Sequence, residues 1–277
     1  MVRAFIYDLH EGLKRQYVRY IILFVTVIIT CIHIDGTIYN DIDIRQYSAG
    51  FVNYVIYMFQ GIRPINQNFN KEYEMPVFWL FFNIYILFVL GGYTADSLKK
   101  DKCQCLVRFK SRVSFIISKY VYICVGTLIY YGCLYFAIMC HMIFRAKIIW
   151  YEPHISKPVN AFGIRIFPSD CYVVCVIVII PFLTSYLYML MCIIAEIYDN
   201  TIIGIAVICI YIVSGAYIPQ SYCISNNMML CRNEYVMSDG ISIIKSLFIL
   251  ICMMLCSIVV GIMRIKRYEY ISKERLK

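Results

Sequence analysis

Apolar stretches long enough to cross a lipid bilayer recur along the whole sequence. A helix rises 1.5 Å per residue, so about 20 apolar residues cross a hydrocarbon core of about 30 Å. Only 16% of the residues are charged, against about 25% in soluble domains. The sequence therefore predicts an all-α integral membrane protein that forms a single transmembrane domain, residues 1–277. The six predicted transmembrane helices are roughly residues 17–34, 76–95, 114–141, 172–195, 201–218 and 243–263.

Lysine and arginine are distributed unevenly between the two sides of these helices. An even number of spans places both termini on one side. The segments on that side carry 17 basic residues, and the longer segments on the other side carry 9. Because basic residues accumulate on the cytoplasmic side, both termini are predicted to be cytoplasmic, with extracellular loops at 35–75 and 219–242. Orientation accounts for the net charge of +9, so no nucleic acid is expected as a partner.

Two of the predicted cytoplasmic segments are amphipathic. In residues 1–16, apolar residues recur at helical spacing among charged ones, which predicts an interfacial elbow helix lying along the membrane. The alternative is that this segment extends the first span inward. Residues 96–113 have the same character and are strongly basic. Their natural neighbours are membrane lipids with anionic headgroups and a cytosolic protein.

The predicted spans lack the residues on which ion coupling and catalysis usually depend. No Asp, Glu or His lies in the core of a span, where a proton or ion relay would need one. The chain has no H-E-x-x-H motif and no G-x-x-x-x-G-K-[ST] phosphate loop. We therefore expect no catalytic, metal-binding or cofactor-binding residues and no enzyme activity on this chain.

Cysteine, proline and glycine give local expectations. Most of the 14 cysteines fall in the spans as small apolar residues, whereas Cys223 and Cys231 lie in an outer loop and are a candidate disulfide. Pro181 should kink the fourth span. Small residues permit close approach of helices, either within the subunit or between subunits. They include Gly126, Gly132, Gly204 and Gly215.

Several motifs form a pattern that resembles one family over nearly the whole chain. Two of them are the aromatic stretch that ends at Gly61 and the start of the second span with Pro76 and Trp79. A third is the basic block of Arg108, Lys110, Ser111, Arg112, Ser118 and Lys119. The others are the outer-loop set of Asn227, Met228 or Met229, and Arg232, and the closing stretch RIKRYEYI. Together they resemble permease subunits of bacterial type-2 ABC exporters, particularly small six-span clostridial ones. The chain departs from that pattern at Ser114 and Phe115, where paired Trp residues are usual, and at Cys103-Gln104-Cys105.

The resemblance implies a permease subunit in the bacterial cytoplasmic membrane that exports an amphipathic substrate, such as a peptide antibiotic, drug or lipid. It also implies a second permease chain, as a homodimer or heterodimer, and a cytosolic ABC ATPase chain that binds ATP and Mg, so this chain itself carries no cofactor. Residues 96–113 would be the coupling segment, and the turn at 196–200 a second contact. The candidate ATPase-coupling residues are Leu98, Lys99, Lys100, Lys102, Arg108, Lys110, Arg112, Glu196 and Asp199.

An alternative of a different class is a membrane sensor or immunity protein. Such a protein would bind a peptide through loops 35–75 and 219–242 without transporting it. An intramembrane enzyme is disfavoured because the sequence lacks the necessary ligands and bases. Copurification of an ATPase would separate the permease from the sensor.

Overall fold

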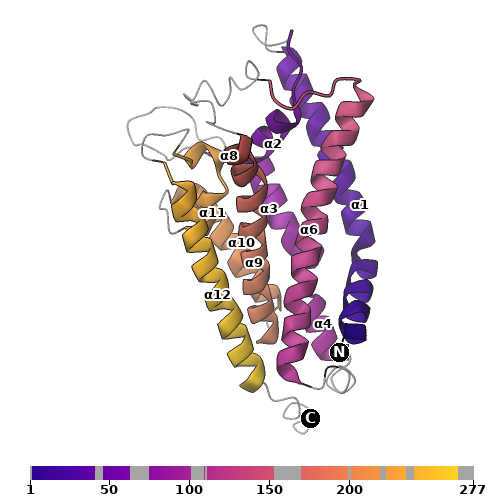
Figure 1. The fold of residues 1–277 in the computed structure, drawn as a ribbon, viewed down its shortest axis with the longest axis vertical. Helices are drawn as coiled ribbons and strands as arrows, with labels where there is room; N and C mark the ends of the chain where they lie inside the picture. Colours follow the sequence, from indigo (N-terminus) through magenta and orange to yellow (C-terminus); the bar gives the residue numbers. More distant parts are fainter. Residues whose placement is uncertain are drawn as a thin grey trace.

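The computed structural model describes residues 2–40, 46–62, 75–100, 109, 111–152, 170–198, 201–218, 223–234 and 240–267. These residues form helices and one isolated β-bridge, between Asn233 and Ile241. The long helices lie side by side along one axis as an elongated bundle (Figure 1). The all-α architecture predicted from the sequence is confirmed.

The bundle is built from long helices that alternate in direction. They are α1 (Val2–Asn40), α3 (Val77–Leu90), α6 (Arg112–Phe144), α9 (Ile180–Ile197), α10 (Thr201–Tyr217) and α12 (Ile243–Arg267). The end where α1 begins and α12 ends also carries α4 (Tyr93–Lys100), and we name it the terminal end (Figure 1). The other end is named the opposite end. It carries α2 (Phe51–Phe59), α8 (Asp170–Val174), α11 (Ile224–Asn227) and the 3-10 helix η3 (Leu230–Arg232).

Within the described residues, five helical segments are long and apolar enough to cross a membrane. They are Leu9–Asn40, Val77–Ser97, Arg112–Phe144, Tyr172–Ile197 and Ile243–Arg267. They match five of the six predicted spans, so the chain is a multi-pass membrane protein. The remaining prediction, residues 201–218, falls on α10, which is apolar but has 17 residues and therefore rises about 25 Å.

Helix α1 corrects the prediction of a separate elbow. It is one continuous helix of 39 residues, Val2–Asn40, so residues 2–16 extend the first span inward, as the alternative proposed. No proline interrupts the segment, and Gly12 packs so closely on Tyr122 of α6 that a Cβ at this position would clash with the ring. This contact holds the first turns of α1 against α6 instead of along the membrane surface.

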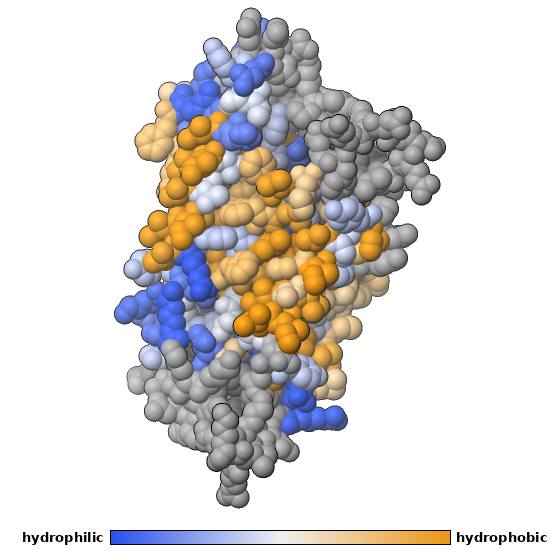
Figure 2. Space-filling view, turned by 180° about the vertical axis from the view of Figure 1, so that it is seen from behind, coloured by the Kyte–Doolittle hydropathy of each residue, from blue (hydrophilic) through white to orange (hydrophobic). Residues whose placement is uncertain are grey.

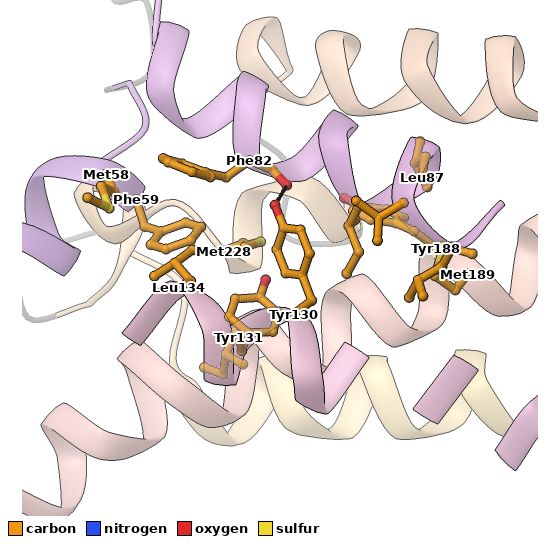
Figure 3. Packing of buried hydrophobic residues seen from close by; sticks show 14 of the residues in the cluster. Met58, Phe59, Phe82, Leu87, Tyr130, Tyr131, Leu134, Tyr188, Met189 and Met228 are labelled. Atoms are coloured by element: carbon orange, nitrogen blue, oxygen red, sulfur yellow. Dashed lines mark hydrogen bonds between the residues drawn. The ribbon is translucent and has the colours of Figure 1, made fainter. Parts of the chain in front are cut away.

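Tyrosine hydroxyls connect neighbouring helices in the core. The hydroxyl of Tyr130 in α6 donates to the carbonyl of Phe82 in α3 at 2.8 Å (Figure 3). Tyr20 of α1 similarly donates to the carbonyl of Gly126 at 3.2 Å. Such bonds add to van der Waals packing, which is the main attraction between helices in lipid. Apolar side chains from several elements pack around Tyr130, among them Met58, Phe59, Leu134, Met189 and Met228 (Figure 3).

Pro181 disturbs the fourth span, and α6 compensates for the disturbance. Proline has no N–H and cannot donate to the carbonyl of Ile177, four residues earlier. The hydroxyl of Tyr135 in α6 donates to that carbonyl instead, at 2.8 Å. Immediately before α9 the chain forms the π-helical turn η2 (Cys175–Ile179). The predicted irregularity is therefore a π-helical turn whose free carbonyl is satisfied by a neighbouring helix.

We expect Tyr135→Phe to destabilise the protein without changing its fold. The variant leaves the Ile177 carbonyl without its donor in the bundle, at a cost of about 1–3 kcal/mol. Thermal unfolding of the purified protein in detergent measures this loss. Tyr186→Phe is the matched control, because the Tyr186 hydroxyl makes a weaker bond of 3.5 Å to the Tyr120 carbonyl. If both variants lost the same stability, the Tyr135 hydroxyl would not have the special role of satisfying the Ile177 carbonyl.

Three of the small residues predicted to allow close helix approach are used within the subunit. Gly126 lies against Leu90 of α3, Gly204 against Ala195 of α9, and Gly215 against Ser225 of α11, each too close for a Cβ. The contacts of Gly204 and Gly215 hold α10 against the bundle near both of its ends. Among the described residues, no atom lies within 4 Å of the position that a Cβ would take at Gly132. The interpretation of close packing within one chain is thus confirmed for α3, α9 and α10.

Apolar side chains cover the outside of the bundle between its two ends. Figure 2 shows this surface on one face, with hydrophilic residues gathered toward the ends. Exposed apolar residues include Ile29 on α1, Val207 on α10 and Phe248 on α12. A soluble protein rarely exposes a contiguous apolar surface of this extent. The belt is the surface that a lipid-embedded bundle requires.

Candidate functional site at the terminal end

The short helix α4 is the first element of the candidate site. After α3 ends, Gly92 adopts a φ of +84°, a left-handed conformation that glycine tolerates better than other residues. The chain then enters α4, which has eight residues. The predicted coupling residues Leu98, Lys99 and Lys100 form its last turn, and their side chains lie outside the described part of the structure. Helix α4 thus carries the start of the predicted coupling segment.

The carboxylate of Glu196 binds the start of α4. Its Oε1 accepts the Gly92 N–H at 2.7 Å, and its Oε2 accepts the Ala95 N–H at 3.0 Å. Thr94 bonds to the same carboxylate. Glu196 lies in the last turn of α9 and is only 2% exposed. The first N–H groups of a helix lack helical acceptors and form its positive dipole end, so this buried carboxylate satisfies them and attaches α4 to α9.

Lys119 of α6 binds α4 from a second helix. Its Nζ donates to the Ser97 hydroxyl at 3.0 Å and lies 4.2 Å from the centroid of the Tyr93 ring. The residue is only 1% exposed. Burying an ammonium is costly unless it has partners, and a hydroxyl and an aromatic face are suitable partners. Helix α4 is therefore attached to α6 as well as to α9.

Glu196 and Lys119 differ from what the sequence predicts. Glu196 is predicted as a direct contact with an ATPase, but its buried carboxylate holds α4 and is not accessible to another protein. Lys119 belongs to the basic block that carries the family resemblance, and the structure buries it. The periodicity of α6 carries a signal for this burial, because Lys119 shares one helix face with Phe115 and Tyr122, which are also buried.

The remaining predicted coupling residues are placed only in part. Arg112 is the first residue of α6, is exposed, and donates to the Lys266 carbonyl of α12 at 2.8 Å. It therefore connects the start of α6 to the end of α12. The other four, Lys102, Arg108, Lys110 and Asp199, lie outside the described residues.

A second polar cluster lies at the opposite end, around Asp35 of α1. Its carboxylate contacts His141 Nε2 at 2.7 Å, Arg145 at 2.5 Å and the Tyr54 hydroxyl at 2.7 Å. Burial, followed by the hydrogen bond to Asp35, raises the pKa of Tyr54, so this phenol stays protonated and donates. The cluster attaches α2 to α1 and α6. The sequence places these residues near span ends but does not indicate that they meet.

Arg232 forms the third buried polar site. Its guanidinium donates to the carbonyls of Gly215 at 2.6 Å, Ala216 at 2.7 Å and Ile62 at 3.0 Å, and also to Asn226. Gly215 and Ala216 are in the last turn of α10, where carbonyls lack helical donors. Ile62 follows α2, so one buried cation joins α2, α10 and η3.

The predicted outer loop 219–242 is in part a packed segment. Residues 223–233 are all buried in the structure. No disulfide joins Cys223 and Cys231 in the structure, so the candidate disulfide is not formed. The Cys231 N–H instead donates to the carbonyl of Gln60 at 2.9 Å. This segment therefore closes the opposite end of the bundle.

At the terminal end, α4 is bonded to both α6 and α9, so it joins two long helices of the bundle. Within the described ranges, no three His, Cys, Asp or Glu side chains come together as metal ligands. Comparisons with protein-family models, curated proteins and solved structures gave no match.

Proposed function

We propose that this chain is the permease subunit of an ATP-driven ABC exporter in the bacterial cytoplasmic membrane, moving an amphipathic substrate. The observation that carries the proposal is the attachment of α4. This short helix ends in two lysines and is held by Lys119 of α6 and Glu196 of α9. A force that a cytosolic ATPase exerts on α4 would reach two long helices that pack on each other.

The orientation of the bundle supports this proposal. Helix α1 begins and α12 ends at the end that carries α4 (Figure 1). The predicted cytoplasmic segments are those with the excess of basic residues. In the proposed topology α10 is the fifth of six spans, both termini are cytoplasmic, and α4 faces the cytosol where an ATPase would bind.

The chemistry of the chain also supports an external energy source. The sequence contains no phosphate loop. The buried charges Glu196 and Lys119 lie at the terminal end and hold α4, and the buried Arg232 lies at the opposite end, so none of the three is placed at mid-membrane where a coupled carrier binds its driving ion. The ATP and Mg would therefore be bound by the partner ATPase. A second permease chain would complete the transport pathway.

Reconstitution tests the proposal directly. The full chain is placed in liposomes with and without its candidate ATPase, and uptake of an amphipathic peptide is followed. We expect movement that requires ATP and stops when the nucleotide site of the ATPase is inactivated. Movement driven by an ion gradient without nucleotide or second protein would overturn the proposal. Peptide binding without movement or ATPase association would identify the chain as a sensor or immunity protein.

Reversing the charges at the end of α4 should weaken binding of the ATPase. In Lys99→Glu/Lys100→Glu, two attractive charges become repulsive, and we expect association to weaken about tenfold or more. Copurified ATPase and substrate-stimulated ATP hydrolysis are the measurements. Lys147→Glu/Lys245→Glu makes the same change in charge at the opposite end and should have no effect. Equal effects of the two double variants would show that α4 is not the contact.

A further inference from the structure

Arg19 of α1 lies where this helix passes the last turn of α3. Its Nη1 donates to the carbonyls of Phe88 and Val89, the second at 3.3 Å. The Tyr85 hydroxyl of α3 donates back to the Arg19 carbonyl at 2.9 Å. The last carbonyls of a helix lack helical donors, so the exposed side chain of Arg19 closes the end of α3 and joins it to α1.

The rest of the Arg19 guanidinium can bind a further acceptor. A guanidinium carries five donors in a fixed fork, and both bonds to α3 come from Nη1. Among the described residues, Nε and Nη2 of Arg19 make no hydrogen bond and no carboxylate pairs with this side chain. Arg15, one turn away, is instead paired with Glu11 at 3.1 Å. Arg19 is therefore an exposed cation whose charge no acidic side chain in the described ranges balances.

Apolar side chains of both helices continue from Arg19 toward the opposite end. Helices α1 and α3 run in opposite directions (Figure 1), so the turns that follow Arg19 lie beside the turns that precede Phe88. Ile22 on α1 is 48% exposed, and Phe81 and Phe88 on α3 are 37% and 55% exposed. A cation at one end of an apolar strip has the polarity of a phospholipid.

These side chains lie on the same side of the α1–α3 pair. Tyr20 of α1 bonds to α6 through the Gly126 carbonyl, and Leu90 of α3 also packs on Gly126. By the helical repeat, Ile22 points about 160° away from Tyr20, and Phe88 points about 160° away from Leu90. Both therefore face away from α6, on the outer side of the boundary that Arg19 bridges.

We infer that the outer boundary between α1 and α3 is a binding site for an anionic phospholipid. Its phosphate accepts from Nε and Nη2 of Arg19, and one acyl chain lies along Ile22, Phe88 and Phe81. Charge complementarity selects this occupant, because arginine binds phosphate in a bidentate manner and basic sites between transmembrane helices bind anionic headgroups. The site depends on membrane insertion and not on the proposed transport activity.

Two variants test the two halves of the site. The full chain is purified in detergent with a mixture of phosphatidylglycerol and phosphatidylcholine, and retained lipid is counted by native mass spectrometry. We expect Arg19→Gln to lower the relative affinity for phosphatidylglycerol about fivefold, with phosphatidylcholine unchanged. Phe88→Ala keeps the backbone carbonyl that Arg19 binds but removes acyl-chain contact, and should lower phosphatidylglycerol retention at least about twofold.

Lys14→Gln is the matched control. It removes the same charge from the same part of α1, and Lys14 is also exposed. Residue 14 lies about 140° around the helix from residue 19, so its side chain is not at the boundary with α3. A site at this boundary predicts little change in the control.

Four outcomes would overturn the inference. An equal loss in Lys14→Gln would indicate a diffuse surface charge, and no loss in either Arg19→Gln or Phe88→Ala would show that a lipid does not occupy the boundary as described. If inorganic phosphate alone raises the unfolding temperature as much as phosphatidylglycerol does, Arg19 binds a free anion. Dimers that lack phosphatidylglycerol beside monomers that retain it would show that a second copy covers the boundary.

Discussion

Glu196→Ala is expected to free α4 from the helix bundle. The variant removes the acceptor of the Gly92 and Ala95 N–H groups. Each buried donor left without a partner costs about 1–3 kcal/mol, and the stabilising charge at the helix N-terminus is lost as well. Hydrogen exchange of the α4 amides and thermal unfolding in detergent measure the effect. We expect fast exchange across α4 and a lower unfolding temperature.

Two further variants serve as comparisons for this experiment. Glu11→Ala removes a carboxylate that pairs with Arg15 at 3.1 Å on the surface, and such exposed pairs contribute about 0–1 kcal/mol. Glu196→Gln keeps the size of the side chain but replaces one acceptor oxygen by a donor, so its exchange should be intermediate. Under the proposed function, Glu196→Ala retains ATPase binding but loses transport. Protected α4 amides in Glu196→Ala would contradict the role assigned to this carboxylate.

Arg232→Ala is expected to open the opposite end. The variant leaves the carbonyls of Gly215, Ala216 and Ile62 without this donor. Each unsatisfied carbonyl costs about 1–3 kcal/mol, so the sum is a large part of the total stability of about 5–15 kcal/mol. Cys231, which is buried and not in a disulfide, is a built-in reporter, because its reaction with a maleimide should become much faster.

Lys245→Ala controls for the loss of a cation at the same end. Lys245 is exposed, so its removal should leave both the unfolding temperature and the maleimide reaction of Cys231 nearly unchanged. Unaltered protection of Cys231 in Arg232→Ala would show that other contacts are sufficient to hold η3. A faster reaction in both variants would point to a general effect of charge.

Hydropathy predicts the long helices well because it is a local property of the chain. Five of the six spans are identifiable in this way, and α10 differs only because its apolar helix is short. The same reasoning fails for residues 1–16, because an amphipathic pattern suits a helix lying on a membrane and a helix packed on a neighbour equally well. The contact of Gly12 with Tyr122 decides between them. That contact joins residues far apart in the sequence.

The candidate site could be predicted only as a region. The basic amphipathic pattern marks residues 96–113, and the turn at 196–200 marks the vicinity of Glu196. The contact between these two regions cannot be predicted from local sequence, since Glu196 and Gly92 are 104 residues apart. Charge alone also leaves the partner of Lys119 undetermined, because an ammonium can face water, lipid or an aromatic ring. The three-dimensional arrangement supplies the missing partner for each.

In the proposed six-span topology, the short length of α10 gives the surrounding bilayer a role in stability. The helix rises about 25 Å, while an average hydrocarbon core is about 30 Å thick. Ile202 and Ile210 are 84% and 68% exposed, so in the proposed topology lipids would contact α10 directly and the bilayer would thin beside it. Such hydrophobic mismatch costs a fraction of a kcal/mol per Å. Thicker bilayers should therefore raise the free energy of this protein, and covering α10 with another protein surface should lower it.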